Sequence, residues 1–400
     1  MGDEIKDASS LAPFTPEEFK ERHGAEVRVE SRVTAIDRKN KNVTVESHGK
    51  RYTESYDKLL IATGAEPYRA PFPGAALPGV FTLRSLGDTK AIKSWITERG
   101  VKKAVVIGGG YIGLECAENL KKRDIDTFIV EMGNKLMAPF DTDVAARVQR
   151  HIENNGVGVQ IGCQVRRIDD EGGLAVQMCP ERRSADMVIL AAGVRPDTGL
   201  AQAAGLEMNK KGSIITDAGM RTSDPNIYAV GDAVQVTNFV TGEADFVPLA
   251  GPASRQGRVA AENILGGDSR YDGAQGSGIL KIFGMTAACT GVNEEKARRH
   301  NIDCGSVSLE YPSHAGYYPG AEEIFMKVVF EKGTGRILGA QLTGLDGVDK
   351  RCDVMAAAIR MRATAHDLTR IELCYAPPFG TPKDIVNVAG DLIEKALGRR

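Results

Sequence analysis

Three glycines and one acidic residue have the types and spacing needed to bind a dinucleotide. Gly108, Gly110 and Gly113 form a G-x-G-x-x-G turn between an apolar run at 105–107 and a run of helix formers at 114–124. In such a turn the first glycine makes the bend, the second lets a pyrophosphate approach the backbone, and the third permits close packing of helix on strand. The free N–H groups of the helix N-terminus then face the phosphates. The alternative is that the glycines only close a βα turn.

Glu131 supplies the acidic partner of this turn. It lies near the end of the next expected strand, 127–132, about 20 residues after the glycines, as the dinucleotide pattern requires. A carboxylate there accepts hydrogen bonds from a ribose 2′-hydroxyl and repels a 2′-phosphate. The pattern therefore favours NADH over NADPH, although the nearby Lys135 would weaken this preference.

Three further turns follow expected strands. Ala62-Thr63-Gly64 follows a strand at 56–61, Ala192-Gly193 follows 187–191, and Gly231-Asp232 follows 222–230. A turn of small residues lets a strand end against a nucleotide, but each could also be an ordinary β-turn. Asp232 could accept hydrogen bonds from a polyol, or it could be the N-cap of the next helix.

Composition excludes several classes of function. The chain has 400 residues with a net charge of −2, and 42% of them are hydrophobic and 26% charged, as in an ordinary globular protein. Without a basic field we expect no nucleic-acid partner and no anionic membrane. Apolar runs such as 187–194 are too short to span a bilayer.

Seven cysteines are scattered without a C-x-x-C pair or metal-like spacing. We expect buried, reduced thiols in a cytoplasmic protein, and no metal site. One alternative is that Cys374, beside Tyr375, is a displaced nucleophile, which we do not favour because nothing in the surrounding sequence activates a thiol. The seven are Cys116, Cys163, Cys179, Cys289, Cys304, Cys352 and Cys374.

The ordered motifs resemble those of the pyridine nucleotide–disulfide oxidoreductases. The resemblance rests on ATG at 62–64, GGGYIGLE at 108–115, Glu131, AAGVRPD at 191–197 and TSDPNIYAVGD at 222–232. The carboxyl-terminal third is similar to the coenzyme A–disulfide reductase and NADH oxidase branch, in SHAGYYPGA (313–321), GLDGVDKRCDVMAAAI (344–359) and YAPPFGTPKD (375–384).

This resemblance implies an α/β flavoprotein with two dinucleotide-binding domains, the NAD domain inserted in the FAD domain, and a carboxyl-terminal α+β dimerisation domain. The expected divisions are 1–99 (FAD domain, first part), 100–213 (NAD(P) domain), 214–270 (FAD domain, second part) and 271–400 (dimerisation domain). The first part holds no G-x-G-x-x-G, and no cysteine stands at the family's redox position. The FAD domain is therefore expected to be amino-terminally truncated, either because Met1 is an internal methionine or because the protein is a short form. Weak flavin binding and exposed sheet edges would follow.

The resemblance also assigns residues to sites. NADH, or NADPH as the alternative, would contact Gly108, Gly110, Tyr111, Ile112, Gly113, Glu131 and Gly193. FAD would contact Ala62, Thr63, Gly64, Gly231, Asp232, Leu249 and Ala250. Tyr317 and Tyr375 would be catalytic and reach across a homodimer interface, and Arg28 and Lys383 would bind coenzyme A phosphates. Either cation could instead be an ordinary surface charge.

The implied function is NAD(P)H-dependent reduction of a small-molecule disulfide such as coenzyme A disulfide. One alternative is an NADH oxidase, peroxidase or polysulfide reductase, with oxygen, peroxide or polysulfide as the acceptor. The other is a catalytically incomplete, NADH-binding dimer.

Overall fold

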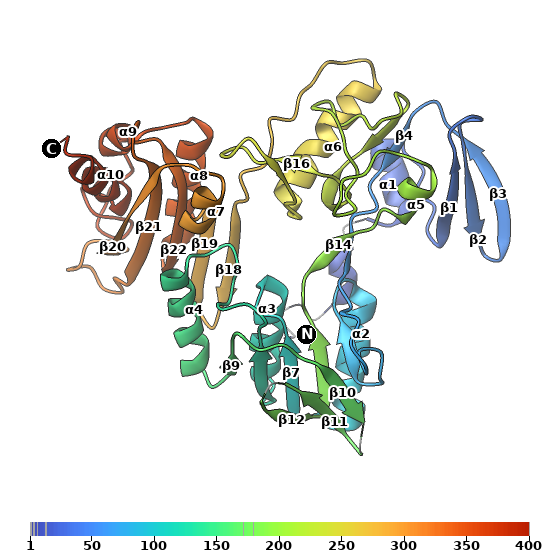
Figure 1. Ribbon diagram of the computed structural model, residues 1–400, viewed down its shortest axis with the longest axis horizontal. Helices are drawn as coiled ribbons and strands as arrows, with labels where there is room; N and C mark the ends of the chain where they lie inside the picture. The colour runs from blue at the N-terminus through green and yellow to red at the C-terminus, as the bar shows by residue number, and fades with distance from the viewer. Residues whose placement is uncertain are drawn as a thin grey trace.

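The computed structural model describes residues 2, 5, 7–12, 14–170, 172–178 and 180–399. The chain forms three packed regions (Figure 1). A nucleotide region lies at the bottom of the view, a second α/β region lies at the upper right, and the carboxyl-terminal region lies at the left.

The nucleotide region is built on a parallel sheet in the order β6-β13-β7-β8-β9. Its apolar strands are buried, as expected when helices cover both faces of a parallel sheet. An antiparallel sheet, β10-β11-β12, lies beside it. The elements are β6 (Val80–Thr82), α2 (Leu86–Arg99), β7 (Lys103–Ile107), α3 (Tyr111–Lys121), β8 (Asp126–Val130), α4 (Thr142–Asn154), β9 (Gly158–Gln160), β10 (Arg167–Asp170), β11 (Leu174–Gln177), β12 (Arg182–Ala185) and β13 (Met187–Leu190).

This region begins and ends earlier than the expected limits of 100 and 213. β6 pairs with β13, and Ile92 and Ile96 of α2 are buried in the same core as Val106 and Leu114. After β13 the chain leaves through β14 (Val194–Pro196), which pairs with β5 (Ala65–Pro67), and then α5 (Gly199–Ala203). Ala201 of α5 packs in the core of the second region. A three-residue strand such as β6 has no detectable periodicity, so the sequence did not reveal where it pairs.

The second region contains a meander and a short parallel pair. β15 pairs with β4, which has no other partner strand in the described part of the chain, and Leu60 on β4 is 38% exposed. The elements are η1 (Ala8–Leu11), α1 (Pro16–His23), β1 (Ser31–Asp37), β2 (Asn42–Ser47), β3 (Lys50–Ser55), β4 (Leu59–Ile61), β15 (Ile227–Ala229), η2 (Gly231–Ala233), β16 (Val236–Thr237), β17 (Ala244–Asp245) and α6 (Ala250–Ile264).

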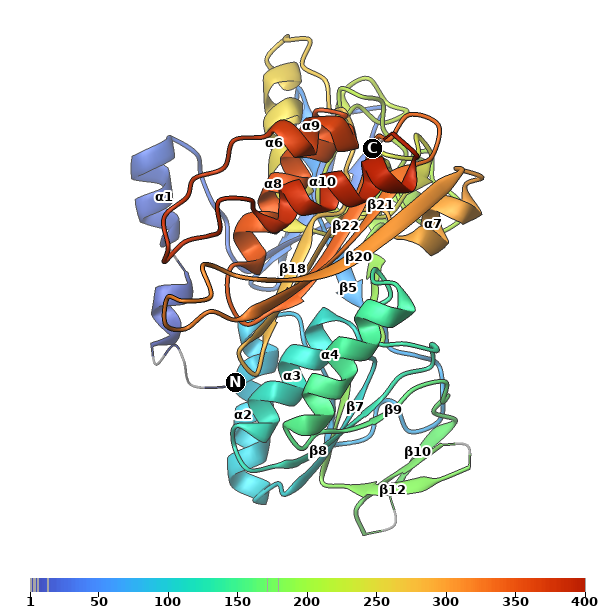
Figure 2. The same cartoon turned by 90° about the vertical axis from the view of Figure 1, so that its left-hand side faces the viewer.

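The carboxyl-terminal region is an antiparallel sheet in the order β18-β19-β22-β21-β20. Helices α8, α9 and α10 cover its outer face (Figure 2). A turn at 333–335 joins two of the strands, β21 and β22. The elements are β18 (Gly278–Ile282), β19 (Met285–Gly291), α7 (Glu294–Arg299), β20 (Cys304–Pro312), β21 (Glu323–Glu331), β22 (Ile337–Gly344), α8 (Val348–Arg360), α9 (Ala365–Arg370) and α10 (Ile385–Ala396). Across the described residues, no helix is both long and apolar enough to cross a membrane.

Candidate active site and nucleotide cleft

The glycine turn between β7 and α3 has the geometry that its spacing predicts. Gly108 has φ +117°, and a Cβ there would lie 2.2 Å from the carbonyl oxygen of Ala191. A Cβ on Gly113 would lie 2.0 Å from the carbonyl oxygen of Gly108. Gly110 differs, because a Cβ there meets nothing within 4 Å and no side chain caps the helix that it starts. Gly108 and Gly113 are thus required by packing, whereas Gly110 faces open space.

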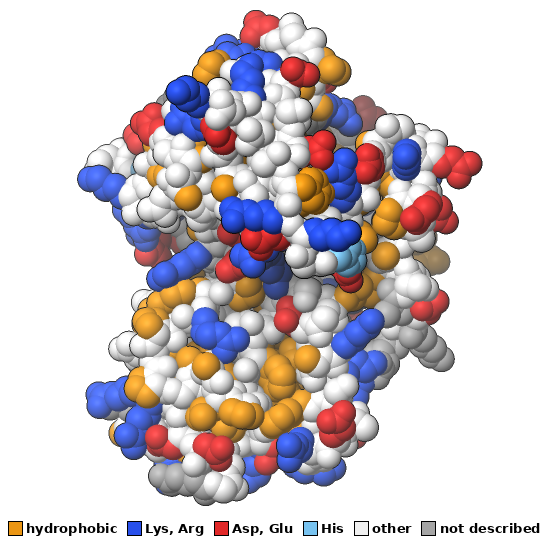
Figure 3. Space-filling view, turned by 90° about the vertical axis from the view of Figure 1, so that its right-hand side faces the viewer, with side chains coloured by type: hydrophobic (Ala, Val, Ile, Leu, Met, Phe, Trp, Pro, Cys, Tyr) orange, Lys and Arg blue, Asp and Glu red, His pale blue; other side chains and the backbone are white. Residues whose placement is uncertain are grey.

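That space is a cavity of about 1350 Å³ between the regions. The molecule is visibly hollowed between its upper and lower parts (Figure 3). One wall is formed by the glycine turn, Glu131 and the 191–193 turn. The opposite wall is formed by 245–249 and by residues 289–299 of the carboxyl-terminal region. A dinucleotide bound at the glycine turn would therefore face all three regions.

Glu131 is held at the cavity wall by backbone donors. Its Oε2 atom accepts a hydrogen bond from the N–H of Gly109 at 2.7 Å, and its Oε1 atom accepts one from Gly133 at 2.6 Å. A carboxylate oxygen has more than one lone pair, so both oxygens can still accept a bond from a ribose hydroxyl.

Some of the other residues expected to contact the nucleotide line the cavity, and one does not. Tyr111 and Gly193 line the cavity, whereas Ile112 does not. The Tyr111 hydroxyl lies 3.7 Å from the Cys289 sulfur, and burial, followed by the neighbouring Cys289, raises the pKa of this phenol. Tyr111 therefore remains a neutral donor at the junction between α3 and β19.

The residues expected to contact FAD gather at the ends of two neighbouring strands. β4 and β15 are parallel, so Ala62-Thr63-Gly64 and Gly231-Asp232 lie side by side where the strands end. Thr63 donates from Oγ1 to the Asp197 carbonyl at 2.5 Å, and Arg84 donates to the Thr63 carbonyl at 3.1 Å. These bonds fix the first turn.

Asp232 is half-buried and carries a free carboxylate. Among the described residues none donates a hydrogen bond to it, and burial raises its pKa while Arg84 partly opposes this rise. The N-cap alternative is wrong, because Asp232 lies in η2 and α6 starts much later, after Leu249. The residue before α6 is Leu249, whose apolar side chain cannot accept a hydrogen bond from the N–H groups of the first turn, which starts at Ala250. Leu249 lines the cavity.

Tyr317 and Tyr375 lie together on the surface of the carboxyl-terminal region. Tyr317 is 78% exposed and Tyr375 is 46% exposed. A hydrogen bond to Tyr317 is the main cause that raises the pKa of Tyr375. Two loops far apart in the sequence thus present a pair of phenols to the outside of the protomer.

A buried ion pair that we did not identify from the sequence joins these loops. Arg351 on α8 donates to Asp384 at 2.8 Å, and the two side chains are 3% and 5% exposed. The same guanidinium donates to the carbonyl of Ser313 at 2.7 Å. Arg351 therefore fixes the loop before Tyr317 relative to the loop after Tyr375. No local sequence signal distinguished Arg351, because α8 carries several other charged residues.

Comparison with known proteins gives the family of this chain. The pyridine nucleotide-disulphide oxidoreductase family model matches residues 2–257, and the model of the corresponding dimerisation domain matches residues 279–384. The chain belongs to this family. The two-domain flavoprotein fold, with a carboxyl-terminal dimerisation domain, is thereby confirmed, as is an enzyme class that uses pyridine nucleotides.

Three relatives in this oxidoreductase family are similar over nearly the whole chain. An NADH oxidase of Methanocaldococcus jannaschii is 36% identical over 399 residues, which cover 99% of this chain and 89% of that protein. A coenzyme A disulfide reductase of Staphylococcus haemolyticus is 31% identical over 393 residues, or 98% and 88%. The solved structure of an NAD-dependent persulfide reductase from A. fulgidus has a TM-score of 0.96 at 37% identity and covers 99% of this chain and 75% of that one.

The two cations expected to bind substrate in this oxidoreductase are not brought together. Arg28 is paired with Glu26 at 2.8 Å and with Glu54, and Lys383 is paired with Asp391. β1, just after Arg28, and α10, just after Lys383, lie at opposite ends of the longest axis (Figure 1). Within one protomer they cannot bind the same small molecule.

The cysteines of the chain are mostly in the core. Cys374 is exposed, which corrects the expectation that all seven are buried, because it lies in the loop between α9 and α10. Cys179 lies outside the described residues. Burial raises the pKa of Cys116 and of Cys352 to about 12, so neither is a thiolate at neutral pH. In the described part of the chain no cluster of three or more ligand-type side chains could hold a metal. The buried thiols are Cys116, Cys163, Cys289, Cys304 and Cys352.

Proposed function

We propose that the chain is an FAD-dependent reductase that transfers electrons from NADH to a small disulfide of the coenzyme A type, as a homodimer. The observation that carries the choice of acceptor is the pairing of Tyr317 with Tyr375 on the exposed face of the dimerisation region. Two phenols held together can donate a proton to a leaving thiolate, which a reductive cleavage of a disulfide requires.

The nucleotide would lie along the glycine turn. Gly110 would let the pyrophosphate reach the backbone, the N-terminus of α3 would supply N–H donors, and Glu131 would accept from the adenosine ribose. Gly193 has φ +103° and an open Cβ side, so the strand can end against the nicotinamide half without a collision. The 245–249 wall would exclude water from that side.

The described residues fit part of a flavin site. Asp232 offers an unshared, half-buried carboxylate to a polyol, and Ala62-Thr63-Gly64 beside it has no bulky side chain. The first turn of α6, at Leu249 and Ala250, offers uncapped N–H groups. A flavin bound there would accept the hydride of NADH and supply two electrons. The chain's own residues bind, orient and exclude water.

The proton donors are the part of the reaction that the chain supplies directly. Because the bond to Tyr317 raises its pKa, Tyr375 stays protonated throughout the neutral range. Arg351 and Asp384 keep the two loops in place, so the pair is positioned before substrate arrives. Neither tyrosine lines the nucleotide cavity of its own protomer, and both would serve a partner's site across the dimer.

A second acceptor class has specific support. Arg28 and Lys383 are each paired with carboxylates, so neither is free to bind the phosphates of coenzyme A without breaking an ion pair. A smaller acceptor without phosphates, such as oxygen, peroxide or a polysulfide, does not need them. The similarity to an NADH oxidase and to a persulfide reductase agrees with this alternative.

The deciding experiment is anaerobic titration of the purified chain, supplied with FAD, by NADH and then by coenzyme A disulfide. Retained yellow flavin that bleaches with NADH and recovers with the disulfide, releasing coenzyme A thiol, supports the proposal. Recovery only with oxygen, peroxide or polysulfide supports the second class. A chain that retains no flavin but binds NADH is the catalytically incomplete dimer. The same assay on Cys374→Ser tests whether the exposed thiol takes part.

A further inference from the structure

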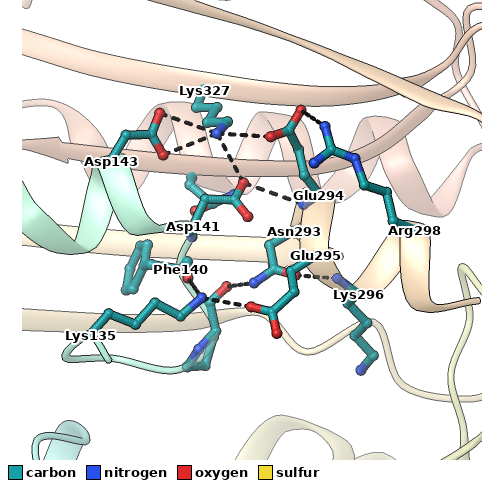
Figure 4. A network of polar contacts seen from close by, with 12 residues as sticks. Lys135, Phe140, Asp141, Asp143, Asn293, Glu294, Glu295, Lys296, Arg298 and Lys327 are labelled. Atoms are coloured by element: carbon teal, nitrogen blue, oxygen red, sulfur yellow. Dashed lines mark hydrogen bonds and ion pairs between the residues drawn. The ribbon is translucent and has the colours of Figure 1, made fainter. Parts of the chain in front are cut away.

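Lys135 lies in the nucleotide cavity with Glu131 but is held by other groups. It follows Glu131 by four positions, and both line the cavity. Its Nζ atom donates to the Phe140 carbonyl at 2.6 Å and to the Oε2 atom of Glu295 at 3.1 Å (Figure 4). The Lys135 side chain is 11% exposed. The ammonium of Lys135, a cation in the same cavity as Glu131, is therefore paired with a residue of the carboxyl-terminal region.

Glu295 is itself fixed from a second side. Its Oε1 atom accepts a hydrogen bond from Arg299 at 2.6 Å, and Arg299 also lines the cavity. The bond to Lys135 and then the charges of Lys135 and Arg299 lower the pKa of Glu295, so it is ionised. One carboxylate thus engages two of the cations at this end of the cavity.

The start of α7 is tied to the loop that carries Lys135. Asn293 caps α7 by accepting from the Lys296 N–H at 2.8 Å, and its amide donates to the Pro139 carbonyl at 3.2 Å. These contacts cross between the two regions, as Figure 4 shows. Glu295 therefore has a defined position relative to the loop after Glu131.

We propose that Glu295 is a specificity-determining residue, which selects a dinucleotide with a free ribose 2′-hydroxyl by withholding Lys135 from the ribose site. This inference rests on the proposed binding of NADH at the glycine turn. A 2′-phosphate carries a charge of about −1.5 to −2 and needs a cation to bind beside Glu131. With Lys135 neutralised by Glu295, this ammonium does not offset the Glu131 carboxylate in the cavity. The selection is made jointly by two regions, and not by the βαβ unit alone.

The test measures binding of two adenine probes, 5′-AMP and adenosine 2′,5′-bisphosphate, by calorimetry at low salt. It therefore needs neither flavin nor turnover. Glu295→Gln keeps the shape of the side chain and frees Lys135. We expect this variant to bind the bisphosphate about tenfold more tightly, the size of one charge-assisted hydrogen bond, with 5′-AMP unchanged. Adding Lys135→Gln is expected to remove the gain.

Glu310→Gln is the matched control. Glu310 pairs with Arg147, lies outside the cavity, and its replacement also removes one negative charge from the carboxyl-terminal region. An equal gain in this control, or no gain in Glu295→Gln, would overturn the inference. A gain that survives in the double variant would also overturn it, because Glu295 would then act through its own charge or through Arg299. If the parent binds neither NADH nor 5′-AMP, the nucleotide site itself is refuted and the inference with it. A parent that binds both while Glu295→Gln gains nothing refutes the inference alone.

Discussion

The Nζ atom of Lys327 on β21 lies 3.2 Å from the Oδ2 atom of Asp141, and their side chains are 7% and 8% exposed. Lys327 also contacts Asp143 at 3.0 Å and Glu294 at 3.3 Å (Figure 4). Asp141 in turn accepts from the Gln341 amide at 2.8 Å. One buried ammonium therefore joins the nucleotide region to the carboxyl-terminal region.

Replacing this ammonium is expected to destabilise the junction strongly. Lys327→Met would leave Asp141 buried without its cation, which costs about 3–5 kcal/mol of unfolding free energy. This loss of unfolding free energy is measured by urea unfolding monitored in both regions. Lys332→Met, which breaks an exposed pair with Asp303, should change stability by less than about 0.5 kcal/mol. Equal effects of the two variants would contradict this account.

The contribution of Lys327 to folding stability should also depend on pH, and it should decrease only as pH rises. Burial alone would lower its pKa, but the bond to Asp143 and the nearby carboxylates outweigh this and raise it. A raised folded pKa means that the stabilisation is complete below the unfolded value of about 10.4 and is lost as pH rises through the folded value. The parent should therefore keep this stabilisation at neutral pH, and the difference from Lys327→Met should shrink only under strongly alkaline conditions.

Two glycines of the turn should respond differently to alanine. The methyl group of Gly110→Ala would contact no other atom, and the backbone at this position has no positive φ. The melting temperature of this variant should therefore match that of the parent. The substitution should nevertheless weaken NADH binding by about tenfold or more, because the methyl group occupies the approach of the pyrophosphate. Gly108→Ala, at φ +117°, should lower stability as well, by about 1–3 kcal/mol from backbone strain alone. Thermal melting beside NADH titration separates these effects, and a destabilised Gly110→Ala would refute the assignment.

The tyrosine pair predicts a specific change in the pH profile. Tyr375→Phe should reduce kcat about 100-fold without altering NADH binding, since general acid catalysis contributes that much. Tyr318→Phe, also exposed and adjacent to Tyr317, is the control and should be nearly neutral. The donor must be protonated, so activity falls as pH rises through its pKa. Tyr317→Phe removes the bond that raises the pKa of Tyr375, and the alkaline fall should move to lower pH. An unmoved fall would mean that the pair does not supply the proton.

Asp232 should show a conflict between stability and flavin binding. Its raised folded pKa means that the ionised side chain destabilises the fold at pH values above the unfolded pKa of about 3.9. Asp232→Asn should therefore melt at a slightly higher temperature at neutral pH, and this advantage should vanish as pH falls to the unfolded pKa. The variant should retain less flavin, measured by absorbance of the desalted protein. Asp170→Asn, at the exposed end of β10, should change neither quantity. Unchanged flavin retention in Asp232→Asn would remove Asp232 from the site.

Local patterns in the sequence were sufficient for the β7–α3 turn. Gly108, Gly113 and Glu131 lie within one βαβ unit, where short-range sterics impose the spacing. The sequence was less informative where a short element joins a distant partner. β6 and α2 belong to the nucleotide region through pairing with β13, and no local pattern indicates that.

The sequence by itself determined the family and the dinucleotide turn, and it supplied the residues that we propose for each cofactor. Only the tertiary structure decided which charged side chains are already paired within the protein and which remain available to a ligand. It paired Lys135 with Glu295, Arg28 with Glu26 and Lys327 with Asp141, and it brought Tyr317 to Tyr375. The physical reason is that backbone turns depend on neighbours along the chain, whereas ion pairs and hydrogen bonds between side chains depend on distances that only packing fixes.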